Sequence, residues 1–445
     1  MSSLLFTHLN ACAFRLRSVA ESALLLSFIV STPGAMAAPL GLTLGEAQQQ
    51  AVARSRQLTA QEHAIDASRE MALAAGQLPD PVLKVGIDNL PVSGPDRFSL
   101  GADFMTMRRV GVSQELTSAD KRQWRAKSLQ SEADKAGAQK YVTMASIQRD
   151  TAIAWLDLYY TEQSAAIVSS QSALARQEIA AAEAAYRGGR GSQVDILAAR
   201  SALVVLDDRA SEIARRLLVA RTMLSRWTGA STELVLAGSP DTDRIRLDPA
   251  TLDSDLAHHP EIEVLNKQEN IAQAQANLAQ ANRRADWTVE VGFQQRGAAY
   301  SNMVSIGVSV PLQWDRSKRQ DRELASKLSM VEQAKAERDE MLREHVAQAR
   351  SMILEWQNGR ERISRYASQL LPLAAQRNRA VLAAYRGGKS TLAEVLAARR
   401  DETELRMQAL QLQMETGRLW AQLNFLFPEN VSAQHSAKIS NQESK

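Results

Sequence analysis

The chain of 445 residues has few of the residues that end helices and form turns. It contains 21 glycines and 12 prolines, about 7% of the chain where roughly 12% is usual. Aromatic residues make up only 5% of the chain, whereas alanine, the best helix former, occurs 70 times. This composition argues against many short, tightly turning elements. It predicts long helices that pack closely through small side chains.

Cysteine is almost absent. The single one, Cys12, lies within residues 1–37, which we interpret as a secretory signal peptide. Arg15 and Arg17 precede an apolar stretch that is too short for an anchor helix, and Ala35-Met36-Ala37 fits a small-x-small cleavage site. The mature chain is therefore expected to be exported, without disulfides or a cysteine-based metal site.

Charge of one sign and long apolar runs are also missing. Lys and Arg total 53 against 50 Asp and Glu, a net charge of +3, which does not indicate a nucleic-acid surface. After residue 38 no window approaches the ~18 apolar residues of a membrane helix. If the exported protein meets a membrane, it must do so through strands, which in lipid alternate with period two and leave no open edge.

Motifs of common enzyme classes do not occur either. The sequence has no Gly-x-Gly-x-x-Gly, no phosphate loop ending in Gly-Lys-Ser/Thr, no His-Glu-x-x-His and no cysteine nucleophile in the mature chain. Scattered carboxylates on helix faces are ordinary solvated or ion-paired groups. We predict a protein that is not an enzyme, with no catalytic residues and no cofactor.

One unit occurs twice along the chain. Residues 184–200 and 383–399 share ten identities in seventeen positions at a constant offset of 199, and both contain Ala-Ala-Tyr-Arg-Gly-Gly. A match of that length indicates a tandem duplication. The predicted parts are a signal peptide at 1–37, repeat 1 at 38–228, a linker at 229–256, repeat 2 at 257–427 and a disordered tail at 428–445.

Two segments of each repeat alternate between apolar and polar residues, the pattern of a strand with one apolar face. We expect strands at about 82–88, 108–116, 287–294 and 303–312. A soluble sheet with one wet face shows the same pattern, but so does the wall of a membrane barrel. The side chains predicted to face lipid are Leu83, Val85, Ile87, Val110, Val112, Trp287, Val289, Val291, Phe293, Val304, Ile306, Val308 and Val310.

Long stretches with very few glycines and prolines follow the strands. The run 117–186 has 70 residues with one glycine and no proline, and 313–385 has only one of each. At 1.5 Å per residue the first would be a helix of about 105 Å. Shorter helices expected at 44–77 and 193–228 together match that length. The predicted unit, mostly α with a small β part, is helix, strand hairpin, long helix, tight turn and returning helix.

Four strands per chain cannot close a membrane barrel, since the smallest have about eight. Open edges in lipid are prohibitive because each unpaired backbone group costs several kcal/mol there. The barrel must therefore be shared between chains. Two chains give eight strands and three give twelve, and cyclic symmetry permits both.

The repeat, the leader, the strand hairpins, the Pro-rich segment Leu78-Pro79-Asp80-Pro81 and the two Gly-Gly turns resemble the TolC-type outer membrane efflux factors over essentially the whole mature chain. The stretch 105–116 is similar to the heavy-metal branch, the CzcC-like cobalt–zinc–cadmium proteins. The resemblance implies a homotrimer with a twelve-stranded β-barrel in the lipid of the outer membrane of a Gram-negative bacterium. A periplasmic α-helical tunnel would continue the barrel.

The same resemblance implies a function. The chain would be the exit duct of a tripartite efflux system, joined to a periplasmic adaptor (membrane fusion) protein and an inner-membrane, proton-driven RND transporter, and would export heavy-metal cations. A multidrug or type I secretion duct of the same fold is an alternative. In another class, so is a soluble periplasmic coiled-coil adaptor or scaffold.

The family's helix-hairpin tips dock the adaptor and close the tunnel. Their pattern, an aromatic residue, a glycine three residues on and an acid six further, falls here on Tyr186, Gly189 and Asp195. The residues that the resemblance assigns to docking are Tyr186, Arg187, Gly188, Gly189, Ser192, Asp195, Tyr385, Arg386, Gly387, Gly388, Thr391 and Glu394. Those that it assigns to a periplasmic gate are Asp195, Tyr385, Arg386 and Glu394. A further acid of the family's best-known constriction is replaced by Ala397, so Glu394 alone would carry an acid ring.

Two groups offer metal-ligating atoms. Met105 and Met107 have thioethers that suit soft ions such as Cu(I), but methionines at a loop–strand junction usually pack against the wall. His258 and His259 precede Pro260 at a helix start and are expected at the surface. We therefore predict no metal site, which does not argue against metal export because a duct need not bind its cargo tightly.

Overall fold

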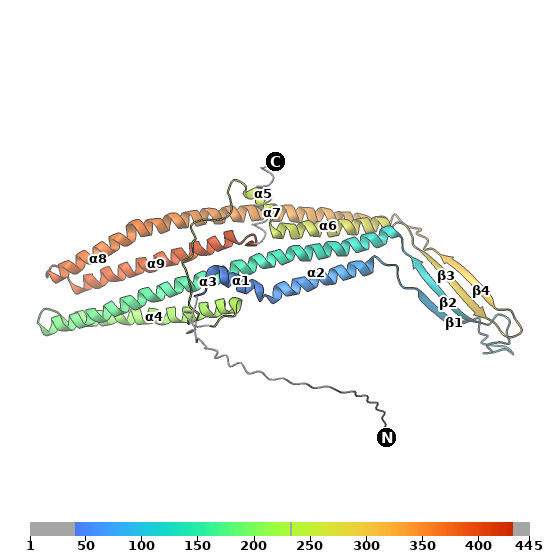
Figure 1. The fold of residues 1–445 in the computed structure, drawn as a ribbon, viewed down its shortest axis with the longest axis horizontal. Coiled ribbons are helices and arrows are strands. Elements are labelled where there is room, and N and C mark those ends of the chain that lie inside the picture. Colours follow the sequence, from blue (N-terminus) through green and yellow to red (C-terminus); the bar gives the residue numbers. More distant parts are fainter. Residues whose placement is uncertain (1–40, 232–233, 430–445) are drawn as a thin grey trace, which may run out of the picture. The chain divides into compact units, whose positions relative to one another are not determined.

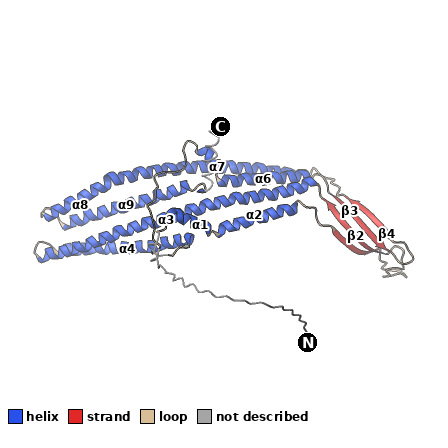
Figure 2. Cartoon of the chain, in the orientation of Figure 1, coloured by secondary structure: helices blue, strands red, loops and turns tan. Residues whose placement is uncertain are grey.

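The computed structural model describes residues 41–231 and 234–429. The expected signal peptide, 1–37, lies outside the described residues, as does the expected tail, 428–445, apart from its first two residues. Helices account for most of the described chain, and an antiparallel sheet lies at one end of them (Figure 2). Within 41–231 and 234–429 no helix combines the length and the apolar character needed to cross a membrane.

The same order of elements occurs twice along the chain (Figure 1). The first set is α1 (Leu44–Ala53), α2 (Arg56–Ala75), β1 (Val82–Asp88), β2 (Met107–Leu116), α3 (Ala119–Arg187) and α4 (Gln193–Thr228). The second, after the short α5 (Leu252–Leu256), is α6 (Pro260–Ala281), β3 (Trp287–Gln295), β4 (Met303–Ser309), α7 (Gln320–Arg365), the π-helical turn η1 (Tyr366–Leu370), α8 (Leu371–Arg386) and α9 (Leu392–Asn424).

Helix α3 is the longest element of the described chain, with 69 residues, about 100 Å at the usual rise. On one side of it α1 and α2 are followed lengthwise by α4, so shorter helices lie end to end along the long one (Figure 1). Helices α6 and α9 also pack against α3. This is the arrangement that the matching helix lengths predicted, and it joins the two repeats side by side.

The single helix expected over 44–77 is wrong, because the chain forms two helices there. Helix α1 ends at Ala53 and α2 begins at Arg56. Ser55 takes an extended backbone and its hydroxyl accepts a hydrogen bond from the Leu58 amide at 3.3 Å. A serine cap of this kind satisfies a backbone amide that a continuous helix would use differently.

The long helix of the second repeat also departs from expectation. It begins at Gln320 instead of residue 313, because Asp315 organises a turn in which its carbonyl accepts from the Lys318 and Arg319 amides at 3.2 and 3.1 Å. It is then interrupted by η1 just before Pro372. Proline has no N–H to bond four residues back, and a π-helical turn is a usual adjustment inside a helix.

The strands pair antiparallel in the order β1-β2-β3-β4. The register places Val85 opposite Val110, and Val110 opposite Phe293. Phe293 in turn faces Val304. The apolar residues of all strands therefore share one face. Strand β4 ends at Ser309, short of the expected residue 312, so the assignment of Val310 to the strand is wrong. Pro311, two residues after Ser309, has no backbone N–H to donate to a neighbouring strand.

The main core lies around the middle of α3. Trp155, Leu156 and Leu158 are fully buried there against residues of α1, α4 and α9. The Trp155 indole also donates a hydrogen bond to the Leu42 carbonyl at 2.9 Å. A buried indole needs such a partner, so this contact holds the start of the described chain against the long helix.

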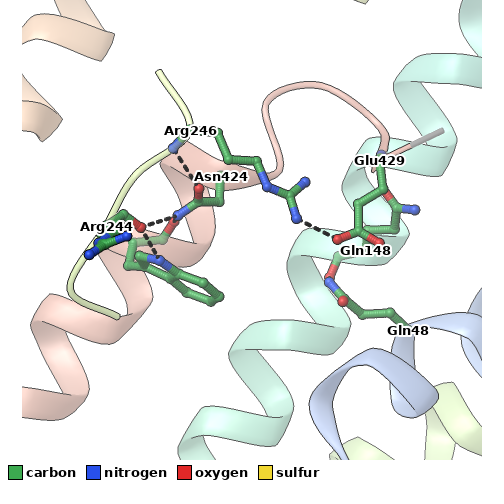
Figure 3. Close-up of polar contacts among 7 residues, drawn as sticks. Gln48, Gln148, Arg244, Arg246, Asn424 and Glu429 are labelled. Atoms are coloured by element: carbon green, nitrogen blue, oxygen red, sulfur yellow. Dashed lines mark hydrogen bonds and ion pairs between the residues drawn. The ribbon is translucent and has the colours of Figure 1, made fainter. Parts of the chain in front are cut away.

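The segment between the repeats is tied to the end of α9 by hydrogen bonds (Figure 3). The Arg246 amide donates to the Asn424 side-chain oxygen at 2.8 Å, and the Trp420 indole donates to the Arg244 carbonyl at 2.7 Å. The Arg246 guanidinium pairs with Glu429 at 2.5 Å. The prediction of a disordered tail from residue 428 is therefore wrong for Pro428 and Glu429, because the ion pair with Arg246 holds this part of the chain in place.

Candidate functional site

The apolar face of the sheet is open to the surroundings. Val85 on β1 is 71% exposed and Ile306 on β4 is 76% exposed, although both are large aliphatic residues. An exposed apolar patch of this kind marks a surface that meets a partner or a membrane. The residues predicted to face lipid that share this face of the strands are Leu83, Val85, Ile87, Val110, Val112, Trp287, Val289, Val291, Phe293, Val304, Ile306 and Val308.

The other face of the sheet is charged. Lys84 on β1 contacts Glu290 on β3 at 2.5 Å across the intervening strand, and Arg109 on β2 lies 3.4 Å from Asp88 and 3.8 Å from Glu290. Opposite charges on neighbouring strands hold the register. Within the described chain β1 and β4 each pair on one side only. The sheet thus has two open edges, one apolar face and one polar face.

A buried ion pair lies where the strands meet the helices. Lys121, near the start of α3, is 4% exposed, and its ammonium donates to the Asp286 carboxylate at 2.7 Å and to the Arg284 carbonyl at 2.6 Å. The other oxygen of Asp286 accepts from the Ser118 amide at 3.1 Å. A fully bonded pair of this kind fixes the direction in which β3 leaves the helices.

At the opposite end each long helix turns back through a Gly-Gly pair. Gly189 and Gly388 have φ values of +70° and +72°, the left-handed backbone that glycine adopts without strain. A Cβ at either position would meet nothing within 4 Å. Both turns are therefore bare on one side, so another backbone can approach them closely.

The acids of the tip pattern cap the returning helices. Asp195 accepts hydrogen bonds from the Ser192 amide at 2.9 Å and from its hydroxyl at 2.8 Å. Glu394 accepts a hydrogen bond from the Thr391 amide at 3.0 Å and another from the Ser390 hydroxyl. These hydrogen bonds, that of Ser390 first, lower the pKa of Glu394. Both turns are thus held by the side chain of the acid that follows them, and Glu394 is ionised at neutral pH.

The two tips differ in their surroundings. Tyr186 is half exposed, whereas Tyr385 packs against a small cluster that contains Ala182 of α3 and Leu392 and Val395 of α9. This cluster joins the two hairpins of one chain. Arg187 and Arg386 lie beside these tyrosines, and among the described residues neither pairs with an acid. Their bridging of neighbouring protomers stays a prediction.

A further ion pair joins the hairpins close to the tips. The Arg399 guanidinium on α9 lies 2.7 Å from the carboxylate of Glu178 on α3, and both side chains are mostly buried. Burial raises the pKa of Glu178, and the positive charge of Arg399 opposes that rise. Nothing in the local sequence around Glu178 marks this pair, because its members come from different repeats.

The metal-ligating groups are not arranged as expected. Met105 is 51% exposed instead of packed. His259, expected at the surface, is only 5% exposed because it caps α6 and lies under Phe427, with the two ring centroids 5.4 Å apart. Among the described residues one set of His, Cys, Asp or Glu ligand atoms gathers within 4.8 Å, namely those of His259, Glu261 and His345. Sequence reasoning missed this cluster.

Comparison with solved structures defines the class of fold. The outer-membrane channel OprN matches with a TM-score of 0.73 at 16% identity, over 86% of this chain and 89% of that one. VceC of Vibrio cholerae matches at 0.70 and 18% identity over 86% and 95% of the chains. CusC matches at 0.73 and 14% identity over 86% and 91%. The chain has the fold of the TolC-type outer membrane channels, as the resemblance implied.

Comparison of sequences gives a particular relative. No family model matches the chain. The sequence is 24% identical over 404 residues to the cobalt-zinc-cadmium resistance protein CzcC of Cupriavidus metallidurans, covering 88% of this chain and 91% of that protein. The similarity to the heavy-metal branch, inferred above from residues 105–116, is therefore confirmed over 88% of the chain.

Proposed function

We propose that the chain is the outer-membrane exit duct of a tripartite efflux system. The observation that carries this proposal is the four-stranded sheet, which has an exposed apolar face and open edges, joined to helices of the TolC-type fold. Lipid is the solvent that such an apolar face suits, and open strand edges in lipid must be paired. The sheet is therefore one section of a barrel completed by other copies of the chain.

Three chains make the barrel in this proposal. In cyclic assembly β4 of one chain pairs with β1 of the next, which removes every open edge. The polar face, with Lys84, Arg109 and Glu290, lines the interior. Two chains would also close a small barrel. We choose three chains because the resemblance to the TolC-type family implies a trimer, and the fold shared with OprN and CusC supports that resemblance. The helices continue the barrel as a periplasmic tunnel.

The hairpin tips are the proposed contact with a periplasmic adaptor protein, which links the duct to an inner-membrane RND transporter. Bare, left-handed glycines at both turns allow the adaptor's helices to approach closely. Asp195 and Glu394 hold the turns in shape through their capping boxes. In the closed tunnel Glu394, together with Asp195, Tyr385 and Arg386, forms the gate.

Heavy-metal cations are the proposed cargo. The similarity to CzcC, which is named for resistance to cobalt, zinc and cadmium, supports this choice. A multidrug or type I secretion duct is the second candidate within the same fold. Deletion of the gene should raise sensitivity to divalent metals and leave sensitivity to dyes and detergents unchanged; the reverse pattern would favour the multidrug alternative.

Cell fractionation tests the duct itself against a soluble scaffold. The mature protein should sediment with outer membranes, need detergent for release and migrate as a heat-modifiable trimer. A variant with Val85, Val291 and Ile306 changed to threonine keeps strand propensity but places three hydroxyl groups on the apolar face, and less of it should reach the outer membrane. Release of the wild-type protein by osmotic shock without detergent would overturn the proposal.

A further inference from the structure

Three potential metal ligands from two helices meet beside the core. His259 is the residue before α6, Glu261 lies in the first turn of α6, and His345 comes from the middle of α7. The His345 Nε2 and a Glu261 carboxylate oxygen are 2.9 Å apart, and the two imidazole rings have centroids 4.8 Å apart. One ligand atom from each residue lies within 4.8 Å of the others.

The His259 ring is held in a fixed orientation. Its Nδ1 accepts a hydrogen bond from the Glu261 amide at 3.3 Å, and the ring is also hydrogen-bonded to the backbone of Leu426. Both ring nitrogens are thus engaged in the metal-free chain. An ion bound at Nδ1 takes over the lone pair that now accepts from the Glu261 amide, while the other nitrogen keeps its backbone partner, as in most metal-bound histidines. Burial lowers the pKa of His259 to about 4, so the ring is neutral at physiological pH.

The other two ligands have the freedom that binding requires. The His345 side chain is 12% exposed and that of Glu261 is 48% exposed, so the carboxylate can turn on the surface without disturbing the core. The hydrogen bond from His345 and the positive charge of Arg149 on α3 lower the pKa of Glu261 and keep it ionised. Around an ion with bonds of ~2.0 Å, tetrahedral ligands lie ~3.3 Å apart. The 2.9 Å separation of His345 and Glu261 must therefore widen slightly, and any separation near the 4.8 Å limit of the cluster must shorten by about 1.5 Å.

Space for further ligands adjoins the cluster. A cavity of about 530 Å³ opens beside it, lined by α3, α6, α7 and the end of α9. Asp150 and Gln348 lie in its wall together with the three cluster residues. Water in this cavity can complete the coordination of an ion that has three protein ligands, because such sites keep a fourth position open.

We propose that His259, Glu261 and His345 bind one divalent transition-metal ion per chain and thereby fasten the start of α6 to α7. Two imidazoles and one carboxylate suit Zn²⁺, Co²⁺ or Ni²⁺. They do not suit Ca²⁺ or Mg²⁺, which prefer oxygen ligands, or Cu(I), which prefers sulfur. The site is independent of the exit-duct proposal, since it lies within one chain and away from the strands and the tips.

Binding should displace protons and stabilise the fold. The hydrogen bond between His345 Nε2 and Glu261 is given up, and its proton released, when both groups turn to the ion. Because the ligands come together only in the folded chain, the ion stabilises the folded state by mass action. The contact of His259 with Phe427 extends this effect to the residues that follow α9.

Isothermal titration of the purified mature protein with ZnCl₂ tests the site. The protein carries no polyhistidine tag and is first dialysed against a chelator. Wild type should bind one Zn²⁺ per chain. His345→Gln, which keeps a hydrogen bond to Glu261, should bind at least about 100-fold more weakly, since loss of even an outer-shell partner costs 10–100-fold. His63→Gln, on the exposed face of α2, is the matched control and should bind as wild type does.

Two further variants separate the site from its neighbours. Glu261→Gln should weaken binding, and Zn²⁺ should raise the melting temperature of wild type but not that of Glu261→Gln. His258→Gln should retain binding. The proposal is overturned if wild type shows no saturable binding of Zn²⁺, if His345→Gln binds as tightly as wild type, or if His258→Gln alone abolishes binding.

Discussion

The crossing of α7 and α9 near Gly359 gives a sharp test of how the helices are packed. Gly359 is buried against Thr416, and a Cβ added to Gly359 would lie 3.2 Å from the Thr416 methyl carbon and 3.3 Å from its Cβ, and closer still to its hydroxyl oxygen. The hydroxyl cannot swing away freely, because it donates to the Leu412 carbonyl at 2.8 Å. Gly359→Ala therefore forces the two helices apart.

Two opposing effects set the magnitude. Overpacking of a close contact costs about 1–3 kcal/mol, whereas alanine is favoured over glycine inside a helix by about 1 kcal/mol. Gly359→Ala should thus lower the free energy of unfolding by about 1 kcal/mol. In a Thr416→Ala background the methyl and hydroxyl groups are gone, and the same change should raise it by up to about 1 kcal/mol. The sign of the effect reverses.

Guanidinium denaturation in detergent, followed by circular dichroism at the helix bands, measures all four members of this double-mutant cycle. The expected coupling between the two positions is about 2 kcal/mol, well above the ~0.5 kcal/mol that independent sites show. Equal effects of Gly359→Ala in both backgrounds would refute the reasoning, because they would mean that α7 and α9 do not touch at this point.

Three other changes test separate parts of the chain. Lys121→Met leaves the Asp286 carboxylate buried without its partner and should cost about 3–5 kcal/mol in denaturation experiments, most of which Asp286→Asn should restore. Glu394→Gln should weaken block of the closed pore by divalent cations in bilayer recordings. In wild type the block should persist down to pH 4.5, the ordinary pKa of the group, and be lost only below it, since a lowered pKa keeps the carboxylate charged. Arg399→Leu removes the ion pair between the hairpins and should separate spin labels on the two tips, whereas Arg400→Leu, an exposed neighbour, should not.

Features encoded in short stretches were predictable from the sequence. The alternation of Val304, Ile306 and Val308 with small polar residues is enough to place them on one face of a strand. The repeated Gly-Gly turns and the matching helix lengths were enough to place α4 end to end with α1 and α2 along α3. These patterns are local or exactly repeated, so they survive without knowledge of the tertiary contacts.

Features that depend on contacts between distant residues were not predictable. His345 follows His259 by 86 positions, and only the packing of α7 on α6 brings them together. Ser55 looks like an ordinary helix residue until its cap is seen, and the order of Pro428 and Glu429 depends on Gln148 and Arg246 far away in the chain. The local sequence predicted a disordered polar tail from residue 428 and one continuous helix over 44–77. The contacts of Glu429 and the cap formed by Ser55 give a different structure in both places.

Cross-linking between the two open edges of the sheet tests the central proposal most directly. The mature chain has no cysteine of its own, so Val85→Cys on β1 and Ile306→Cys on β4 can be introduced together and treated in outer membranes with a short bis-maleimide. Closure of a barrel by three chains predicts covalent dimers and trimers of the double-cysteine variant, with nothing larger. Neither single-cysteine variant should give a product larger than a dimer. A series that ends at the dimer, or a product that remains monomeric, would contradict a barrel shared by three chains.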